Sequence, residues 1–442
     1  MITDVDTGRQ RAVLVAVQLP GVRDDQHLAS LRELRRLAET LGMTVVGEVT
    51  QRRKNLDPGV VIGEGRLRDL AGWTGGPQPP PEPGEDPPEP LEKRADVVVV
   101  DHELTPMQMR NLAAKTSAAV LDRAGVIVEI FHRHASSREA RLQVEMARLR
   151  YVAPRLRQSA GGFDRKGGGI GAKGSWESQL EIDKRKVRDR LAEIRREIAE
   201  IEGERRVRRA RRTQANRVAL VGYTNAGKSS WMRALTGSDV LVADKLFATL
   251  DTTVRALVPE TQPRILMSDT VGFIDKLPHD LVASFRSTLD EALEASLLVF
   301  VADAADPGFR EQLDVVRRVL SEIGATGIPS WLWLNKVDRL DPVAQRMLAD
   351  EFPEATLLSS RDPSAVTAMH SALVAHFHRD LPEVEILVPY DRAGAVGQIW
   401  GQATVLAEAS EESGIRYRIR AAASVVEQLR AVLGAAPPGR QA

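Results

Sequence analysis

The sequence has no cysteine among its 442 residues, which excludes a disulfide scaffold and any zinc site held by thiolates. It has no net charge either, because 61 lysines and arginines balance 61 aspartates and glutamates. Affinity for nucleic acid must therefore come from a local excess of positive charge. Long hydrophobic runs are also missing: VLVAV and SLLVFVA are far shorter than the roughly 20 residues that a transmembrane helix needs.

The N-terminus, MITDVDTGRQ, is polar and acidic, unlike a signal peptide. With the missing hydrophobic runs, this predicts a soluble cytoplasmic protein and not an integral membrane protein. The length allows two to four domains, at about 100–200 residues each.

Residues 1–125 alternate short β-rich runs with helical patterns. The β-rich runs begin at Ala12, Met43, Ala95 and Ala118. This alternation predicts a small parallel α/β domain. Residues 77–90 (PQPPPEPGEDPPEP) are too rich in proline and acidic residues for a core, so we interpret them as an extended loop inserted into this domain.

Residues 126–213 carry two long helical patterns separated by a glycine-rich stretch, 161–176. They predict an antiparallel helical hairpin with an exposed tip. The tip holds Arg165, Lys166 and Lys173 against one acidic residue. These three side chains are candidates for contact with RNA phosphates; the alternative is that such charges only solvate a long helix.

Residues 215–380 again alternate strand and helix patterns and contain a phosphate-binding motif. The motif G-x-x-x-x-G-K-[ST] follows the apolar run VALV and precedes a helical pattern, as such loops do. We expect glycine to let backbone amides surround phosphate oxygens, Lys228 to reach the β- and γ-phosphates, and the Ser229 hydroxyl to bind Mg²⁺. The residues of the loop are Gly222, Tyr223, Thr224, Asn225, Ala226, Gly227, Lys228 and Ser229.

Two further motifs follow apolar runs downstream and complete the pattern of a guanine-nucleotide site. Asp269, at the end of the first run, is suited to hold Mg²⁺ through water, and the Gly272 amide to contact the γ-phosphate. Asp338 in the second motif can accept two hydrogen bonds from guanine, whereas adenine offers no matching donors; the stem of Lys336 is placed to lie on the guanine ring. The motifs are Asp269-Thr270-Val271-Gly272 and Asn335-Lys336-Val337-Asp338.

The sequence leaves the roles of three features near these motifs open. The switch threonine that completes the Mg²⁺ shell is Thr249, Thr252 or Thr253, and spacing does not choose among them. The loop Ser359-Ser360-Arg361, after a short apolar run, is the candidate second base-contacting loop. Phe273 occupies the position where many GTPases have a water-orienting glutamine, which predicts slow hydrolysis without a partner; a buried core phenylalanine explains it equally well.

Residues 381–442 carry alternating runs, VEILVPY and IRYRIRA, among short helical patterns, and predict a small α+β domain. The fold class expected is thus α/β. A P-loop GTPase domain is preceded by an α/β N-terminal domain with a long antiparallel helical hairpin and followed by a small α+β C-terminal domain.

The runs GYTNAGKS, LFATLD and DTVGFIDKLPHDLVASFRSTL resemble the HflX family of ribosome-associated P-loop GTPases, in the Obg-HflX superfamily. LQVEMARLRYVAPRL and GGIGAKG…WESQLEIDKR are similar to the N-terminal region of that family. The sequence departs from the family in three places: Lys173-Gly174-Ser175-Trp176-Glu177 stands where the family has RGPGE, the base-contacting loop has no glycine, and the acidic proline-rich loop interrupts the N-terminal domain.

The resemblance implies a Mg²⁺-dependent GTP hydrolase that binds GTP and GDP and uses Lys228, Thr249 and Gly272 in catalysis. Ser229 and Thr249 would be the Mg²⁺ ligands. The nucleotide would also be lined by Phe247, Ala248, Thr249, Leu250 and Asp251. The implied partners are the large ribosomal subunit and its ribosomal RNA, and the implied role is splitting or rescue of stalled ribosomes under stress.

Three other functions compete with this one: an assembly or hibernation GTPase that binds subunits without splitting ribosomes, an RNA-binding module that does not hydrolyse nucleotide, and an ATP-driven RNA-remodelling enzyme. We expect a monomer that does not bind DNA.

Overall fold

The computed structural model contains two compact units, each made of segments that are distant in the sequence. The first unit comprises Met1–Glu204, Ala243–Asp251 and Ile274–Ser287, and the second comprises Arg205–Val242, Thr252–Phe273 and Thr288–Ala442. The structure describes residues 10–77, 94–159, 173–210, 216–238, 246–247, 253–276, 291–392 and 394–434. Apart from Pro77, the proline-rich stretch predicted at 77–90 lies outside these ranges.

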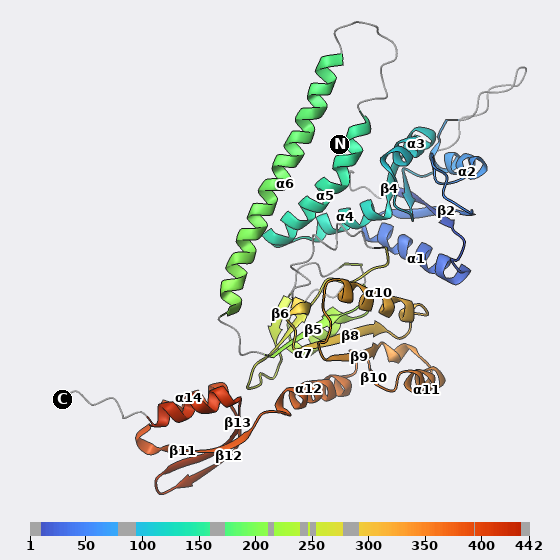
Figure 1. The fold of residues 1–442 in the computed structure, drawn as a ribbon. Coiled ribbons are helices and arrows are strands. Elements are labelled where there is room, and N and C mark those ends of the chain that lie inside the picture. Colours follow the sequence, from blue (N-terminus) through green and yellow to red (C-terminus); the bar gives the residue numbers. More distant parts are fainter. Residues whose placement is uncertain are drawn as a thin grey trace, which may run out of the picture. The chain divides into compact units, whose positions relative to one another are not determined.

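The first unit contains a four-stranded parallel sheet in the order β2-β1-β3-β4, of which Figure 1 labels β2 and β4. Its strands are β1 (Arg11–Gln18), β2 (Thr44–Arg52), β3 (Val97–Val100) and β4 (Ala119–Asp122). Its helices are α1 (Asp24–Thr40), α2 (Glu64–Thr74), α3 (Pro106–Thr116) and α4 (Arg123–His134). Valines of β1 and β3 form a core with α2 and α3. The predicted parallel α/β domain is therefore confirmed.

Helices α5 (Arg138–Ser159) and α6 (Lys173–Ala210) lie side by side in the first unit (Figure 1). Leu142 and Met146 of α5 pack on Ile194 of α6, and the Arg190 guanidinium donates to both carboxylate oxygens of Glu145 at 2.7 and 2.8 Å. The predicted hairpin is confirmed by these contacts.

Two details of the hairpin differ from the prediction. Its first helical pattern forms two helices, α4 and α5, because the Ser137 hydroxyl accepts a hydrogen bond from the Ala140 amide (3.1 Å) and starts α5 anew. Helix α6 begins at Lys173, so residues 173–176 are helical and not part of the glycine-rich tip. One glycine at a helix start costs only about 1 kcal/mol relative to alanine, and the helix that follows it is long.

The second unit is built on a six-stranded sheet in the order β10-β9-β8-β5-β7-β6. All neighbouring strands are parallel except β6 and β7. The strands are β5 (Asn216–Val221), β6 (Thr253–Ala256), β7 (Ile265–Asp269), β8 (Leu297–Asp303), β9 (Ser330–Asn335) and β10 (Ala355–Leu357). Thr253, one of three predicted switch threonines, lies in β6 opposite Asp269.

Helices cover both faces of this sheet. On one face α7 (Lys228–Thr236) and α12 (Pro363–His378) share a core in which the rings of Trp231 and Trp333 are 4.9 Å apart. On the other face lie α10 (Phe309–Glu322) and α11 (Pro342–Glu351). This doubly covered, mostly parallel sheet brings the carboxyl ends of β5, β7, β8 and β9 to one edge, where ligands of such folds bind.

The C-terminal part of the second unit is a small antiparallel sheet in the order β11-β13-β12. Its elements are β11 (Glu383–Pro389), α13 (Gly394–Gln402), β12 (Thr404–Glu411), β13 (Gly414–Arg420) and α14 (Ala423–Gly434). The predicted α+β appendage is confirmed, with β12 as an unexpected strand because its sequence, TVLAEASE, is largely polar and small. Within the described residues, no helix is long and apolar enough to cross a membrane.

Candidate functional site

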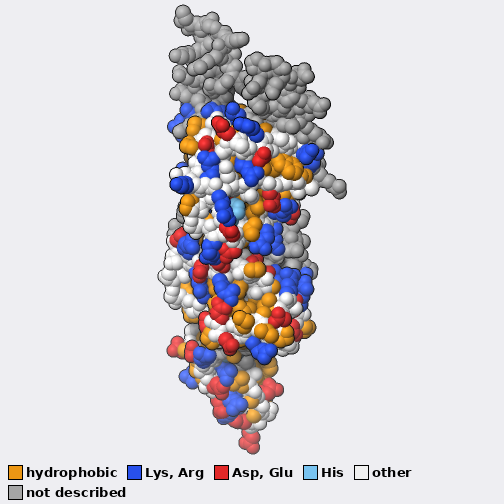
Figure 2. Space-filling view, turned by 90° about the vertical axis from the view of Figure 1, so that its right-hand side faces the viewer, with side chains coloured by type: hydrophobic (Ala, Val, Ile, Leu, Met, Phe, Trp, Pro, Cys, Tyr) orange, Lys and Arg blue, Asp and Glu red, His pale blue; other side chains and the backbone are white. Residues whose placement is uncertain are grey.

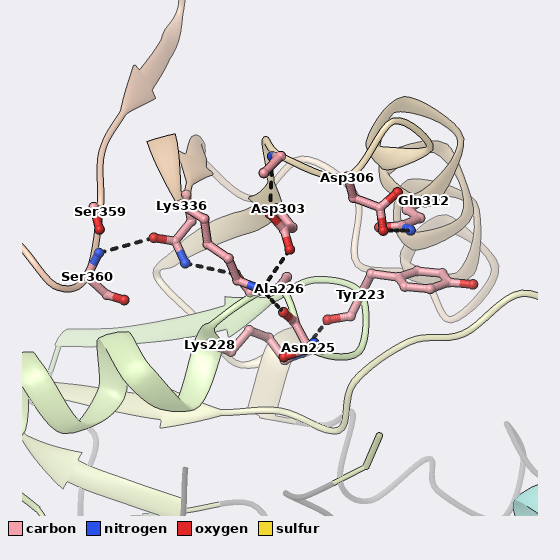
Figure 3. A network of polar contacts seen from close by, with 12 residues as sticks. Tyr223, Asn225, Ala226, Lys228, Asp303, Asp306, Gln312, Lys336, Ser359 and Ser360 are labelled. Atoms are coloured by element: carbon pink, nitrogen blue, oxygen red, sulfur yellow. Dashed lines mark hydrogen bonds and ion pairs between the residues drawn. The ribbon is translucent and has the colours of Figure 1, made fainter. Parts of the chain in front are cut away.

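The phosphate-binding motif joins the end of β5 to the start of α7, as expected from its sequence (Figure 3). Its glycines stand where side chains do not fit. A Cβ at Gly222 would lie 2.2 Å from the Val301 carbonyl oxygen, and one at Gly227 would lie 2.2 Å from Asn335 Nδ2. Gly227 also has a φ of +100°, a left-handed conformation that favours glycine.

Lys228 is almost completely buried and turns back onto its own loop. Its Nζ donates to the carbonyl oxygens of Gly222 (3.0 Å) and Tyr223 (2.9 Å). Burial lowers the pKa of this ammonium group to about 8, although the Asp269 carboxylate opposes the shift. A cation that is poorly solvated and held mainly by neutral carbonyls will favour a multiply charged anion.

Ser229 and Asp269 meet beside this lysine. The Ser229 hydroxyl donates to Asp269 Oδ2 at 2.6 Å, and Asp269 is completely buried at the end of β7. A hydroxyl and a carboxylate are hard oxygen donors of the kind that Mg²⁺ takes together with phosphate oxygens and water. The residues present therefore fit this ion.

Gly272 lies against the phosphate loop, as the γ-phosphate role requires. A Cβ at Gly272 would come within 2.8 Å of Thr224 Cγ2 and 3.3 Å of Lys228 Nζ. The next residue, Phe273, pairs with the same loop: its carbonyl accepts from the Thr224 amide (2.8 Å) and its amide donates to the Gly222 carbonyl (3.2 Å). The Phe273 side chain is buried, which accounts for an apolar residue here without a catalytic role.

The asparagine and lysine of the guanine motif contact the phosphate loop directly; Figure 3 labels Lys336 beside Asn225 of that loop. Asn335, fully buried at the end of β9, donates from Nδ2 to the Ala226 carbonyl (2.9 Å), and its Oδ1 accepts from the Ser360 amide (3.2 Å). Lys336, which has a φ of +64°, donates from Nζ to the Asn225 carbonyl at 2.7 Å. The three motifs predicted to form one site therefore meet within the second unit.

Asp338 belongs to a short 3₁₀ helix, η1 (Val337–Arg339), and contacts the predicted second base loop. The Ser359 hydroxyl donates to Asp338 Oδ1 at 2.6 Å and accepts from the Arg361 amide at 3.2 Å. The Arg361 guanidinium lies 3.9 Å from Asp338 Oδ2. The carboxylate expected to read guanine is thus oriented by the loop after β10.

Asp303 is a residue of this site that the sequence motifs did not reveal. It ends β8, and its Oδ2 accepts a hydrogen bond of 2.6 Å from Lys336 Nζ. The only signal in the sequence is an acidic residue at the end of the apolar run LLVFVAD. An acidic residue at a strand end belongs to no nucleotide-binding motif, so this signal alone does not identify Asp303 as a site residue.

Several predicted site residues fall outside the described residues or outside this unit. Ala248, Thr249, Leu250, Asp251, Arg165 and Lys166 lie outside the described residues, as does the side chain of Lys173. Phe247 groups with the first unit, where its buried ring meets Phe131 edge-on at 4.5 Å. Their nucleotide or RNA contacts remain predictions.

Comparisons with known proteins agree with this geometry. Three family models match successive parts of the chain: "GTP-binding GTPase N-terminal" (residues 28–132), "GTP-binding GTPase Middle Region" (residues 134–212) and "50S ribosome-binding GTPase" (residues 217–336). The GTPase HflX of Gluconacetobacter diazotrophicus is 54% identical over 444 residues, which cover 96% of this chain and 98% of that protein. The chain belongs to the HflX family.

Other HflX proteins show the same extent of similarity. The GTPase HflX of Caldanaerobacter subterraneus is 37% identical over 96% of this chain and 93% of its own length. That of Escherichia coli is 35% identical over 94% of this chain and 93% of its own length. As an HflX protein, the chain is a GTP hydrolase of a ribosome-binding GTPase family. The matched GTPase region contains the phosphate loop and the first two residues of the guanine motif, Asn335 and Lys336.

Proposed function

We propose that this HflX protein binds GTP with Mg²⁺ in the second unit, docks on the large ribosomal subunit, and splits or rescues stalled ribosomes under stress. The match to a 50S ribosome-binding GTPase family over residues 217–336, which contain the phosphate loop and the motif Asp269–Gly272, carries this proposal. Hydrolysis would return the protein to a state with low affinity for the ribosome.

The roles proposed for the site residues follow from their positions. Lys228, already desolvated, would exchange its two carbonyl partners for β- and γ-phosphate oxygens. The Gly272 amide would donate to the γ-phosphate. Ser229 and Thr249 would hold Mg²⁺, with Asp269 acting through a water molecule. When bound, the ion neutralises negative charge on the phosphate oxygens.

Guanine recognition is assigned to Asp338, whose carboxylate would accept hydrogen bonds from N1 and N2 of the base. The backbone amides of Ser359, Ser360 and Arg361 would face guanine O6, and the Lys336 stem would cover one face of the ring. Because Phe273 has no group that could orient water, we expect slow intrinsic turnover and acceleration by the ribosome.

The hairpin is proposed to contact ribosomal RNA through its cationic tip and the adjacent part of α6. There Arg185, Lys186 and Arg188 are exposed, and lysine and arginine in such a position can neutralise phosphates. On the face that Figure 2 presents, Lys and Arg are interspersed with Asp and Glu. A local cationic segment is therefore the expected RNA contact of a chain without net charge.

GTP turnover with and without purified large subunits, combined with light scattering of intact ribosomes, tests this proposal. We expect turnover to rise at least tenfold with large subunits, and scattering to fall as ribosomes dissociate. Arg188→Glu should weaken binding to the subunit, whereas Arg346→Glu, an exposed arginine on α11, is the matched control. Binding without dissociation would instead support an assembly or hibernation factor, and absence of both effects would refute a ribosomal role.

A further inference from the structure

Asp303 occupies a fixed position between the two halves of the nucleotide site. In the pairing of β8 with β9 it lies opposite Asn335, and the Ala304 amide donates to the Asn335 carbonyl (2.9 Å). Both carboxylate oxygens of Asp303 are used: Oδ1 accepts from the Ala305 amide at 3.1 Å, and Oδ2 accepts from Lys336 Nζ at 2.6 Å. A strand end and a backbone amide therefore orient this carboxylate.

Lys336 in turn joins Asp303 to the phosphate loop. Its ammonium group lies between Asp303 Oδ2 and the Asn225 carbonyl oxygen, 2.7 Å away (Figure 3). The side chains of Lys336 and Asp303 are each only 16% exposed, so water screens their attraction less than it would on an open surface. The carbonyl alone is a neutral acceptor, and the carboxylate is the stronger partner for the ammonium group.

We propose that Asp303 is a positioning residue for nucleotide binding, which acts by holding Lys336 against Asn225 without itself touching the nucleotide. This inference rests on the proposed nucleotide site. Lys336 has to present its stem to the guanine ring while its ammonium group supports the phosphate loop. Asp303 fixes that ammonium group before nucleotide arrives, so less side-chain freedom is lost on binding.

The role of Asp303 is separable from the stability of the fold. The guanine motif is attached to its surroundings by other contacts, which include the bonds from Asn335 to the Ala226 carbonyl and from the Ser360 amide to Asn335. These do not involve Asp303. Loss of its charge should therefore release the Lys336 side chain and leave the backbone of the site in place.

The test is Asp303→Asn, which keeps the shape of the side chain and removes its charge. We expect affinity for GDP and GTP, measured with fluorescent nucleotide analogues, to fall about 10- to 100-fold, the range expected for one charge-assisted hydrogen bond. KM should rise by a similar factor, while kcat at saturating GTP changes less than about threefold. The matched control is Asp306→Asn in the loop that follows β8. The Asp306 carboxylate accepts hydrogen bonds from the Gly308 amide (2.9 Å) and from Gln312 Nε2 of α10 (3.1 Å), away from Lys336, so this variant should bind nucleotide normally.

A double-mutant cycle separates positioning from general damage. In a Lys336→Met background, Asp303→Asn should weaken binding less than about twofold further, because the group that it positions is gone. Unchanged affinity in the single variant, or an equal loss in the Lys336→Met background, would overturn the inference. Failure of the unmutated protein to bind GTP would instead refute the proposed nucleotide site, and Lys228→Ala provides the non-binding reference.

Discussion

Replacing Gly227 by alanine should disable the nucleotide site through a single methyl group. The new Cβ would lie 2.2 Å from Asn335 Nδ2, about 1.2 Å closer than the 3.4 Å at which ordinary van der Waals contact begins. Asn335 is fully buried and cannot move without losing its bonds to Ala226 and Ser360. Loss of each such bond costs about 1–3 kcal/mol, and the left-handed backbone of Gly227 adds about 1–2 kcal/mol for alanine.

These terms give a strain of about 3–8 kcal/mol, which the loop can relieve only by leaving the conformation that surrounds phosphate. We expect GDP affinity to fall at least 100-fold in a fluorescence titration. Gly237→Ala is the matched control: Gly237 also has a positive φ, +60°, but nothing lies within 4 Å of its Cβ position. If Gly227→Ala binds GDP within threefold of Gly237→Ala, the steric reasoning is wrong.

Three further changes test individual contacts. Phosphate binding favours the charged form of Lys228, and the pKa of this ammonium group in the free protein is about 8. GDP affinity should therefore fall about tenfold between pH 7 and pH 9. The Lys228→Arg variant should bind GDP more weakly, but its guanidinium is always protonated. Its GDP affinity should therefore show no such change in a pH series. Ser359→Ala removes the 2.6 Å hydrogen bond that orients Asp338 and should weaken GDP binding about 3- to 10-fold by calorimetry, whereas Ser364→Ala should not. Asp101→Asn removes the carboxylate whose Oδ1 accepts a 2.7 Å hydrogen bond from the buried Arg123 guanidinium. This change should lower the free energy of unfolding by about 3 kcal/mol in a urea titration.

The effect of Asp101→Asn on stability also depends on pH, in a direction that follows from the pKa of Asp101. Burial alone would raise the pKa of Asp101, but Arg123 and Lys276 outweigh it and hold that pKa below its usual value. The ionised carboxylate therefore contributes stability above about pH 4, and this contribution is lost as pH falls through the lowered pKa. At acidic pH the stabilities of Asp101→Asn and the unmutated protein should converge, and a constant difference would contradict this cause.

The sequence predicted the parts of the site that depend on local geometry. The phosphate loop needs glycine where backbone approaches backbone, and the positions of Gly222 and Gly227 in the structure show this requirement directly. Strand ends carrying Asp269 and Asn335 were predictable because apolar runs end sharply at polar residues. The parallel sheet of the first unit was predictable in the same way, from four short apolar runs in the sequence.

Features that depend on contacts across the fold were not predictable. The ion pair of Asp303 with Lys336 joins two strand ends that only the sheet order brings together. Lys276 meets Asp101 at 2.7 Å across 175 positions of sequence, and no local pattern marks either residue. The short strand β6 was not predicted because its four residues, TVRA, none of them buried, show no period of their own.

A calorimetric titration of the unmutated protein with GTP and with ATP, both with Mg²⁺, tests the central claim most directly. We predict micromolar or tighter binding of GTP and at least 100-fold weaker binding of ATP, with Asp338→Asn losing most of that preference because the base would lose its carboxylate acceptor. Equal affinity for the two nucleotides, or binding of neither, would contradict the assignment of this edge of the sheet to guanine nucleotides.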